Sequence, residues 1–243
     1  MPFFLHIMKA GNGFTFKRFH INHDRCAMKV GTDGILLGAW ADLANSRSIL
    51  DLGTGSGLIA LMLAQRSDED VQIHGVERDP AAARQAQENF RASPWAHRLY
   101  LHFGDIADFA QKCGQKFDNI VANPPYFAQG VDCRNHARNA ARYTAALSHA
   151  QWLEIASSLL TEQGTIHFVL PAEQGKTLKQ STALYCVRQC DVISKQGKAA
   201  QRVLLSFMKE KKETAYSELT IYDEKNRYTL EFIQLTREFY LKF

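Results

Sequence analysis

The sequence predicts a single α/β domain in which helices cover both faces of a mostly parallel β-sheet. Between residues 48 and 208, short and nearly all-apolar runs alternate with stretches whose apolar residues recur at helical spacing. Strands that are apolar throughout are buried on both faces, which is typical of a doubly wound parallel sheet. No internal repeat and no Pro/Gly/Ser-rich linker divides the chain, and its 243 residues, 46% of them apolar, suffice for one full core.

Seven strands and three intervening helices are expected in this core. The strands are Ser48–Leu52, Val71–Val76, Leu99–Phe103, Phe117–Ala122, Thr165–Leu170, Val187–Ser194 and Arg202–Met208, and the helices are Leu58–Gln65, Pro80–Arg91 and Ala150–Leu160. Only a few residues around Gly197 join the last two strands, so these strands should pair antiparallel. We therefore expect a seven-stranded sheet with one antiparallel strand at its edge.

Two short extensions flank the core, which we place at residues 46–210. Residues 1–45 hold an aromatic and basic segment followed by an apolar helix that Thr32 or Asp33 could cap. Residues 211–243 are expected to form a short strand, a turn at Asp223–Asn226 and a helix that ends near Tyr240, packed on the core.

Composition and charge narrow the class of protein. No apolar run approaches the ~18 residues of a membrane helix, and the N-terminus lacks the features of a signal peptide. Five cysteines without zinc-ligand spacing favour reduced thiols and no metal, so we expect a cytoplasmic protein with no membrane partner. The net charge of +4 permits a polyanionic partner without requiring one. The sequence leaves the oligomeric state open.

A glycine-rich turn follows the first expected core strand. It reads Asp51-Leu-Gly53-Thr-Gly55-Ser-Gly57, and its G-x-G-x-G spacing differs from the G-x-G-x-x-G of dinucleotide-binding folds. Glycines allow a ligand to lie against bare backbone. The carboxylate of Asp51 would repel a diphosphate but suits a ligand that carries an ammonium group. The turn therefore favours S-adenosyl-L-methionine over a dinucleotide.

Acidic residues follow the next two expected strands. Glu77 ends the second strand and is suited to accept hydrogen bonds from both ribose hydroxyls, and Asp105 follows the third strand, where it would take the adenine amino group. Because the carboxyl ends of parallel strands meet at one edge of a sheet, we expect the cofactor at that edge. The plain alternative is a tight turn beside a solvated charge, and the ordered set of three strand ends argues against it.

The most specific feature of the chain is Asn123-Pro124-Pro125-Tyr126, which follows the fourth expected strand. The residues before the two prolines are held extended, and neither proline has an N–H, so the loop is rigid and rich in acceptors. The Asn123 side-chain oxygen and the Pro124 carbonyl can together accept both hydrogens of a planar amine, and Tyr126 offers a flat face. Such acceptors stabilise the positive charge that grows as the nitrogen takes a methyl group. Neither a strong base nor a metal is required.

These residues resemble those of the Rossmann-like amino methyltransferases. The segments Phe14–His20 and Met28–Trp40 extend the likeness to the bacterial tRNA (adenine-N6)-methyltransferases that modify valine tRNA, over nearly the whole chain. The resemblance implies that Asn123 and Pro124 hold the target amine and that Tyr126 stacks on the base.

The same resemblance implies a tRNA substrate and a set of cofactor neighbours. The segment before the first core strand closes over the cofactor in that family, so Lys29, Thr32 and Asp33 are expected beside it. Arg78 is also expected there, although many relatives have an apolar residue against the adenine at this position. Basic residues are available for RNA phosphates at Lys17, Arg18, Arg25, Arg134, Arg138, Arg142, Lys195, Lys198 and Arg202, and phenylalanines at positions 14, 16 and 19 are available for bases.

Two other functions remain open at this point. The N-P-P-Y motif also occurs in enzymes that methylate some guanine N2 amines or protein glutamine amides, so it names a reaction more firmly than a substrate. A non-catalytic RNA-binding module of the same fold is the other alternative. The intact glycine turn and the intact Asn123–Tyr126 motif argue against such a module, because RNA binding alone needs neither.

Overall fold

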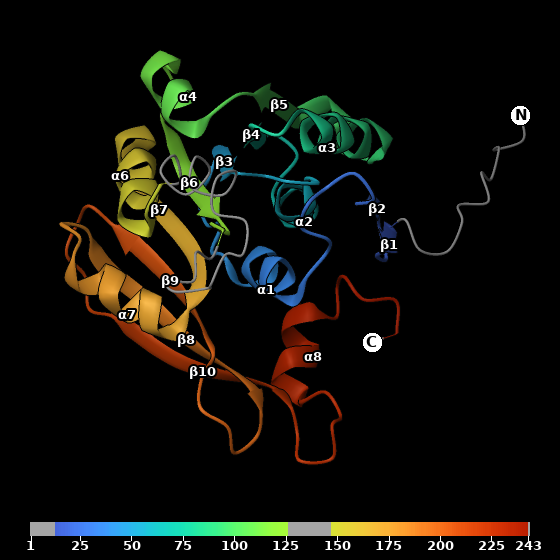
Figure 1. Cartoon of the computed structure of the whole chain (residues 1–243), viewed down its shortest axis with the longest axis vertical. Coiled ribbons are helices and arrows are strands. Elements are labelled where there is room, and N and C mark those ends of the chain that lie inside the picture. Colours follow the sequence, from blue (N-terminus) through green and yellow to red (C-terminus); the bar gives the residue numbers. More distant parts are fainter. Residues whose placement is uncertain (1–12, 126–146, 243) are drawn as a thin grey trace, which may run out of the picture.

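The computed structural model describes residues 13–125 and 147–242, which form one main sheet with helices on both faces (Figure 1). The strands are β1 (Gly13–Thr15), β2 (His20–Asn22), β3 (Ser48–Leu52), β4 (Gln72–Glu77), β5 (Leu99–Phe103), β6 (Phe117–Ala122), β7 (Leu160–Pro171), β8 (Tyr185–Lys195), β9 (Arg202–Met208) and β10 (Ala215–Tyr222). Within this part of the chain, eight strands build the sheet in the order β10-β8-β9-β7-β6-β3-β4-β5, and β1 and β2 pair separately.

Helices pack on the two faces in separate groups. They are α1 (Thr32–Trp40), α2 (Leu58–Arg66), α3 (Pro80–Ala92), α4 (Ile106–Lys112), α6 (His149–Leu159), α7 (Ala172–Gln180) and α8 (Leu230–Thr236), with the 3-10 helix η1 (Ala96–Arg98). Neighbouring residues of β3 point to opposite faces, so Ile49 packs with α1, α2 and α8 while Leu50 packs with α4, α6 and α7. The predicted doubly wound, Rossmann-like fold is confirmed.

The far end of the sheet differs from the prediction. Strand β9 pairs antiparallel with both β7 and β8, as the short connection around Gly197 required. It is not an edge strand, however, because β8 inserts beyond it and β10 then adds to β8 in parallel. The C-terminal extension thus contributes an eighth strand. Its first four residues are exposed and only its second half alternates buried and half-buried residues, so the sequence gave only a weak strand signal.

All strands of the main sheet except β9 run in one direction, so their carboxyl ends share one edge. We call the border of the sheet where these seven strands end the carboxyl edge, and the border where they begin the amino edge. The strand order reverses direction at β3, which pairs with β4 on one side and with β6 on the other. Such a switch point is where open α/β sheets bind ligands, outside the carboxyl ends of the strands.

Helix α1 brings part of the N-terminal segment to the carboxyl edge. A methyl group on Gly34 would lie 3.1 Å from Leu58, and one on Gly38 would lie 2.8 Å from Met62, so α1 and α2 run side by side in the same direction. The first turn of α1 therefore lies beside the first turn of α2. The expectation that Thr32 or Asp33 caps α1 is wrong: both lie inside the helix, and Gly31 is the N-cap without a side-chain hydrogen bond.

The short helices α4 and α7 and the helix η1 were not expected. Helix α4 buries only Ile106, and α7 buries only Gly175 and Leu178, so neither carries a clear apolar periodicity. The helix of the C-terminal extension ends at Thr236, four residues before the expected end at Tyr240. Within the described ranges, no helix combines the length and the apolar character needed to cross a membrane.

Candidate active site at the carboxyl edge

The glycine turn leaves β3 at the switch point of the sheet. Gly53, Gly55 and Gly57 have φ angles of +70°, +58° and +87°, which other residues rarely adopt. A methyl group on Gly53 would lie 2.8 Å from the Trp152 ring, and one on Gly57 would lie 2.5 Å from the Phe90 ring. A methyl group on Gly55 would meet nothing within 4 Å among the described residues. Two of the glycines thus serve close packing, and no described residue packs against Gly55.

Asp51 is fully buried beneath this turn. Its Oδ2 accepts hydrogen bonds from the Thr54 hydroxyl at 2.6 Å and from the Ala60 N–H, in the first turn of α2, at 3.2 Å. Its Oδ1 is buried and has no hydrogen-bond partner among the residues that the structure describes. Burial raises the pKa of Asp51 to about 7. A buried carboxylate oxygen normally has a hydrogen-bond donor or a cation beside it, so Oδ1 is a candidate contact for a ligand.

Glu77 ties the end of β4 to the glycine turn. Its Oε2 accepts a hydrogen bond from the Gly55 N–H at 2.9 Å, and its Oε1 accepts one from the Asp79 N–H at 2.8 Å. An ionised carboxylate has about four acceptor sites, so each oxygen of Glu77 retains one for a ligand. The side chain is half-buried. Its two hydrogen bonds fix its position, and acceptor sites remain for a ligand.

Arg78 and Asp105 join the ends of β4 and β5. The Arg78 guanidinium lies 3.9 Å from Asp105 Oδ2, with 61% and 38% of the two side chains exposed. Asp105 also caps α4, where its Oδ1 accepts a hydrogen bond from the Ala107 N–H at 2.8 Å. This capping role of Asp105 was not predicted from the sequence. Arg78 points at this carboxylate, and such an exposed pair contributes little to stability.

Asn123 and Pro124 follow β6 directly. Leu52 of β3 pairs with Ala122 of β6, so Gly53 and Asn123 leave the sheet side by side. Asn123 is half-buried and Pro124 is buried. Tyr126 lies outside the described residues, as do Arg134, Arg138 and Arg142, so their expected roles stay predictions.

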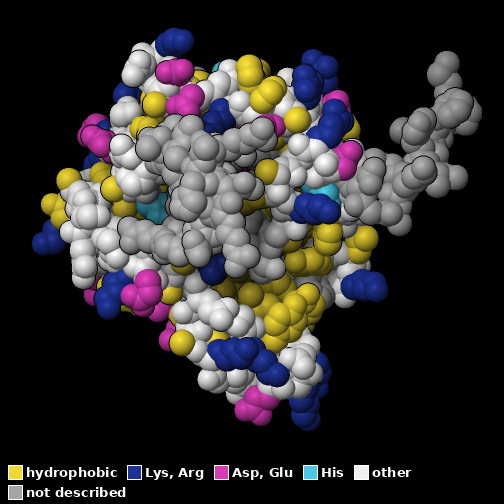
Figure 2. Space-filling view, viewed as in Figure 1, with side chains coloured by type: hydrophobic (Ala, Val, Ile, Leu, Met, Phe, Trp, Pro, Cys, Tyr) yellow, Lys and Arg dark blue, Asp and Glu magenta, His cyan; other side chains and the backbone are white. Residues whose placement is uncertain are grey.

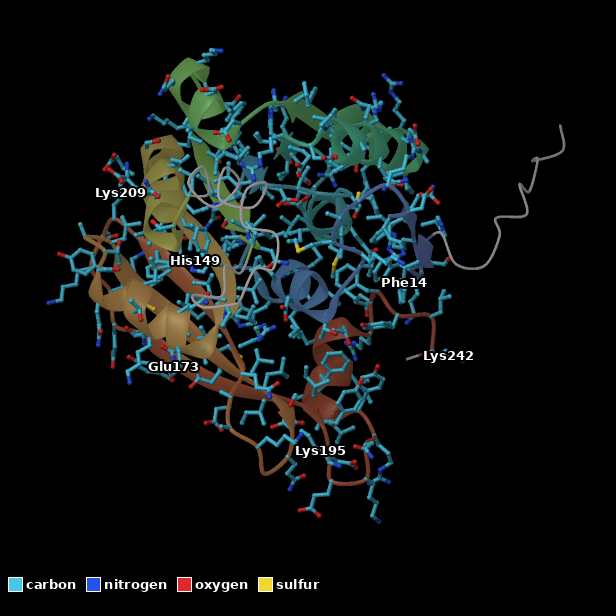
Figure 3. The ribbon with its side chains drawn as sticks, viewed as in Figure 1. Phe14, His149, Glu173, Lys195, Lys209 and Lys242 are labelled. Atoms are coloured by element: carbon cyan, nitrogen blue, oxygen red, sulfur yellow. The ribbon has the colours of Figure 1, made fainter. Side chains whose placement is uncertain are left out.

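Helix α6 contacts both halves of this site through residues that the sequence analysis missed. His149 lies in its first turn (Figure 3) and forms a hydrogen bond with the backbone of Pro125. Trp152 lies three residues later on the same side of the helix, and its ring covers Gly53. Burial lowers the pKa of His149, and its Nε2 is buried without a hydrogen-bond partner among the described residues. The capping box formed by Ser148 and Gln151 was the available signal for the start of this helix.

The three N-terminal residues expected beside the cofactor reach the same edge but differ in their contacts. Asp33 forms an ion pair with Arg202 at 3.0 Å, which connects the first turn of α1 to the first residue of β9. Thr32 starts α1, and Lys29 is exposed two residues before its N-cap. The ion pair of Asp33 with a residue 169 positions away could not be read from local sequence.

Buried polar residues of α3 anchor the preceding segment. Asn89 donates from its amide to the Asn22 carbonyl at 2.9 Å and to the Ser56 carbonyl at 2.8 Å, and thus joins β2 to the glycine turn. Gln85 accepts from the Arg25 N–H at 2.8 Å. These contacts explain how a segment without a helix or a long strand is held beside the carboxyl edge.

Two of the three phenylalanines of this segment do not offer faces for RNA bases. Phe16 and Phe19 are 2% and 6% exposed, and their rings stack on each other with centroids 4.6 Å apart. Phe14 is partly buried against the same core and contacts the Tyr240 ring. The possibility that Phe16 and Phe19 stack on bases is therefore wrong, because their rings belong to the hydrophobic core.

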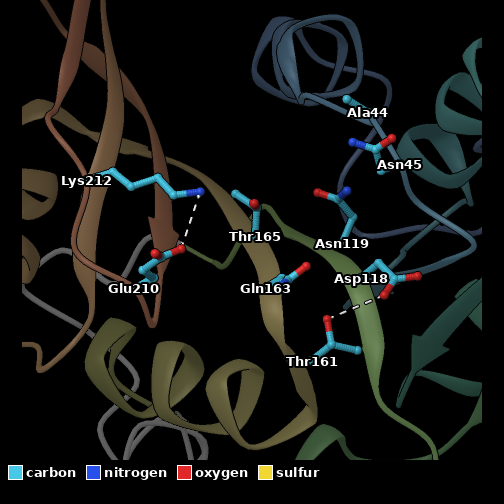
Figure 4. A pocket seen from close by; sticks show the side chains of 9 residues that line it. All are labelled: Ala44, Asn45, Asp118, Asn119, Thr161, Gln163, Thr165, Glu210 and Lys212. Carbon is cyan, nitrogen blue, oxygen red and sulfur yellow. Dashed lines mark hydrogen bonds and ion pairs between the residues drawn. The ribbon is translucent and has the colours of Figure 1, made fainter.

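The amino edge carries a cavity of about 420 Å³ (Figure 4). It is lined by Ala44, Asn45, Asp118, Asn119, Thr161, Gln163, Thr165, Glu210 and Lys212. The residues described here contain no group of three or more His, Cys, Asp or Glu side chains placed to hold a metal ion.

Comparison with known proteins agrees with the fold. Residues 30–199 match the family model described as the methyltransferase small domain. A predicted O-methyltransferase from Agrobacterium tumefaciens has a similar structure, with a TM-score of 0.68 at 17% identity over 85% of this chain and 96% of that chain. The fold and the family model together define a methyltransferase.

Two curated relatives narrow the class. The tRNA1(Val) (adenine(37)-N6)-methyltransferase of Mannheimia succiniciproducens is 57% identical over 100% of both chains. The enzyme of the same name from Pasteurella multocida is 60% identical over 96% of this chain and 98% of its own. The chain belongs to this family of tRNA1(Val) (adenine(37)-N6)-methyltransferases, and the resemblance stated from the sequence is confirmed.

Proposed function

We propose that this chain transfers the methyl group of S-adenosylmethionine to the N6 amine of an adenosine in tRNA, and that Asn123 and Pro124 hold the amine. The substrate follows the names of the relatives, which specify adenine 37 of tRNA1(Val). We place the methyl transfer in the core at residues 46–210, which the two extensions flank. We expect the reaction to take place in the cytoplasm and to need no metal.

The observation that carries this proposal is the pairing of Leu52 with Ala122. It sets the glycine turn and the Asn123–Pro124 segment at adjacent strand ends, and parallel strands lie about 4.8 Å apart. A ligand on the turn and a planar base on the segment would therefore be neighbours. Methyl transfer requires this proximity, because the two reacting atoms must approach within about 3–3.5 Å.

The residues around the turn fit S-adenosylmethionine. The unpartnered Oδ1 of Asp51 suits its ammonium group, the free acceptor sites of Glu77 suit its ribose hydroxyls, and the open side of Gly55 leaves room for the chain between them. When bound, S-adenosylmethionine supplies a methyl carbon that its sulfonium already activates. Lys29, Thr32, Asp33, Arg78 and Asp105 complete the proposed cofactor neighbours.

Asn123 and Pro124 act on the amine through their oxygens. The Asn123 side-chain oxygen and the Pro124 carbonyl each accept one N–H hydrogen, so the nitrogen lone pair is released from the ring and faces the methyl donor. These acceptors also stabilise the positive charge that develops on nitrogen, because they are fixed before the reaction starts. The methylated nitrogen then loses a proton to water.

The test separates RNA from protein substrates. The chain is incubated with methyl-labelled S-adenosylmethionine and either total tRNA or a protein extract, and nucleosides from the tRNA are analysed by mass spectrometry. We expect N6-methyladenosine in tRNA and no gain when the candidate adenosine is replaced by guanosine. Label in a protein glutamine instead, or in neither pool, would refute the proposal.

A further inference from the structure

Two neighbouring turns at the far end of the carboxyl edge form a basic surface outside the site described above. The first turn joins β8 to β9, and the second follows β10. Figure 2 shows Lys and Arg side chains gathered at this lower end of the molecule, and Figure 3 places Lys195 there. We call Lys195, Lys198, Lys225 and Arg227 the C-terminal basic surface. Resting on the function proposed above, we propose that it binds the phosphate backbone of the substrate tRNA several nucleotides away from the methylated one.

These two turns carry more basic than acidic residues. Residues 195–202 and 222–229 contain five basic and two acidic residues. Arg202 and Arg227 are paired with Asp33 and Asp223, so the unpaired positive charge of the two turns comes from lysines. Lys198 and Lys225 are exposed and form no ion pair with the described residues. Uncompensated ammonium groups of this kind bind phosphates by releasing counterions.

The two turns are joined to each other and held rigid. The Lys195 ammonium donates to the Asn226 side-chain oxygen at 2.9 Å, and the Gln196 N–H donates to the Tyr222 carbonyl at 2.8 Å. Asp223 closes the second turn by accepting from the Lys225 N–H at 2.8 Å and by pairing with Arg227 at 2.7 Å. The spacing of the cations is thus fixed before any partner binds, which reduces the entropy lost on binding.

An aromatic stack supports the second turn from below. The Tyr228 ring stacks on Tyr222 and on Phe232, with both pairs of centroids 4.8 Å apart. Stacking on two protein rings holds Tyr228 and the second turn in place. The groups that this surface presents are cations, which bind phosphates and carry no base specificity.

The position of the surface matches a single RNA strand that passes the active site. In the strand order, β8 is three positions and β10 four positions from β6. With about 4.8 Å between strands, their carboxyl ends lie about 14 Å and about 19 Å from the Asn123 end of β6. One nucleic-acid strand carries a phosphate every ~3.4 Å of helix rise, so the surface lies about four to six nucleotides from the target base.

The test neutralises two exposed lysines on each edge of the sheet. The test variant is Lys198→Gln with Lys225→Gln. The matched control is Lys211→Gln with Lys212→Gln, which changes the net charge equally where β9 ends at the amino edge. Affinity for purified substrate tRNA is measured by fluorescence anisotropy at several salt concentrations, with S-adenosylmethionine affinity measured in parallel as a check of folding.

We expect the test variant to bind tRNA about tenfold more weakly near 0.1 M salt. We also expect the slope of log Kd against log salt to fall by about 1.4 to 1.8, the value for two lost phosphate contacts. The control should match the wild type, and all three should bind S-adenosylmethionine equally. Equal tRNA binding by test and control variants would overturn the assignment. Methylation of tRNA by the wild type is measured with the same sample. If the wild type methylates tRNA, equal binding of the variants contradicts only the role of this surface; if it does not, the proposed function fails as well.

Discussion

The two edges of the sheet both present polar groups, but they satisfy them differently. At the amino edge, Asp118 accepts hydrogen bonds from the N–H groups of Arg47 and Ser48, at 2.9 and 3.1 Å, and from the hydroxyls of Ser48 and Thr161, at 3.1 and 3.4 Å. At the carboxyl edge, Asp51 is more deeply buried, and only one of its oxygens has a hydrogen-bond partner among the described residues. Asp118 thus has hydrogen bonds to both of its oxygens, whereas Asp51 Oδ1 has none among the described residues.

A buried network in the middle of the sheet shows the same completeness. Both ring nitrogens of His167 are bonded, to Asn119 at 2.7 Å and to Ser206 at 2.8 Å, and burial lowers its pKa to about 3. His149 at the carboxyl edge has one nitrogen without a partner among the described residues. The difference teaches where a ligand would find unused polar groups: Asp51 Oδ1 and His149 Nε2, both without a partner among the described residues, lie at the carboxyl edge, whereas the cavity of about 420 Å³ lies at the amino edge.

The largest expected effect comes from Asn123→Ala. Removing one fixed oxygen that faces developing charge should lower kcat for tRNA methylation by about 10²–10³ or more. Affinity for S-adenosylmethionine should change little. Gln163→Ala at the amino-edge cavity is the matched control, and its activity should stay within about twofold of the wild type. Comparable activity of Asn123→Ala and the control would remove the distinction between the edges.

Asp51→Asn tests the unpartnered carboxylate through pH. Burial raises the pKa of Asp51 from 3.8 to about 7, so the protonated form stabilises the fold below pH 3.8 and this stabilisation is lost as pH rises to about 7. The variant escapes this loss. In urea denaturation without ligand, its stability relative to the wild type should therefore rise by about 2 kcal/mol between pH 5 and pH 7, at about 1.4 kcal/mol per pH unit until the slope falls close to pH 7. A constant difference across this range would show that Asp51 does not titrate there.

His149→Phe tests whether α6 positions the acceptor loop. Phenylalanine keeps the ring but loses the hydrogen bond to the Pro125 backbone, a loss of about 1–1.5 kcal/mol. We expect kcat to fall about tenfold, with unchanged S-adenosylmethionine affinity and a melting temperature within a few degrees of the wild type. A purely structural role would instead lower the melting temperature and leave kcat per folded molecule unchanged.

The smallest expected effect is that of Arg78→Leu. Its ion pair with Asp105 is 3.9 Å long and exposed, so it should contribute less than about 1 kcal/mol. S-adenosylmethionine affinity measured by calorimetry should change less than about fivefold in either direction. A larger loss would assign Arg78 a direct contact with the cofactor.

The sequence predicted those parts of the fold that a strong local pattern specifies. Four of the seven expected strands, among them Ser48–Leu52 and Phe117–Ala122, have the bounds that the structure shows, because three of these runs end in Gly or Pro turns and the fourth ends in a run of charged residues. Strand β10 was expected, but its place beside β8 was not. Pairing between segments about 27 residues apart depends on which edge remains open, which no local pattern records.

The candidate site was predictable as a set of strand ends and unpredictable in its contacts. Gly53, Glu77, Asp105 and Asn123 follow neighbouring strands, so topology alone brings them to one edge. The contact of His149 with Pro125 joins residues 24 positions apart across the sheet edge, and a helix start gives no hint of its target. Sequence patterns thus indicated the residues expected to contact a ligand, and they missed residues such as His149 that position those residues.

The most direct measurement is a crystal structure of this chain with S-adenosylhomocysteine and the anticodon stem–loop of the substrate tRNA. We expect the ligand's ammonium group at the free oxygen of Asp51, its ribose at Glu77, and the exocyclic amine of the target adenine donating to the Asn123 side-chain oxygen at about 2.7–3.2 Å. A ligand seated in the amino-edge cavity, or an adenine amine turned away from Asn123, would contradict the assignment of the carboxyl edge.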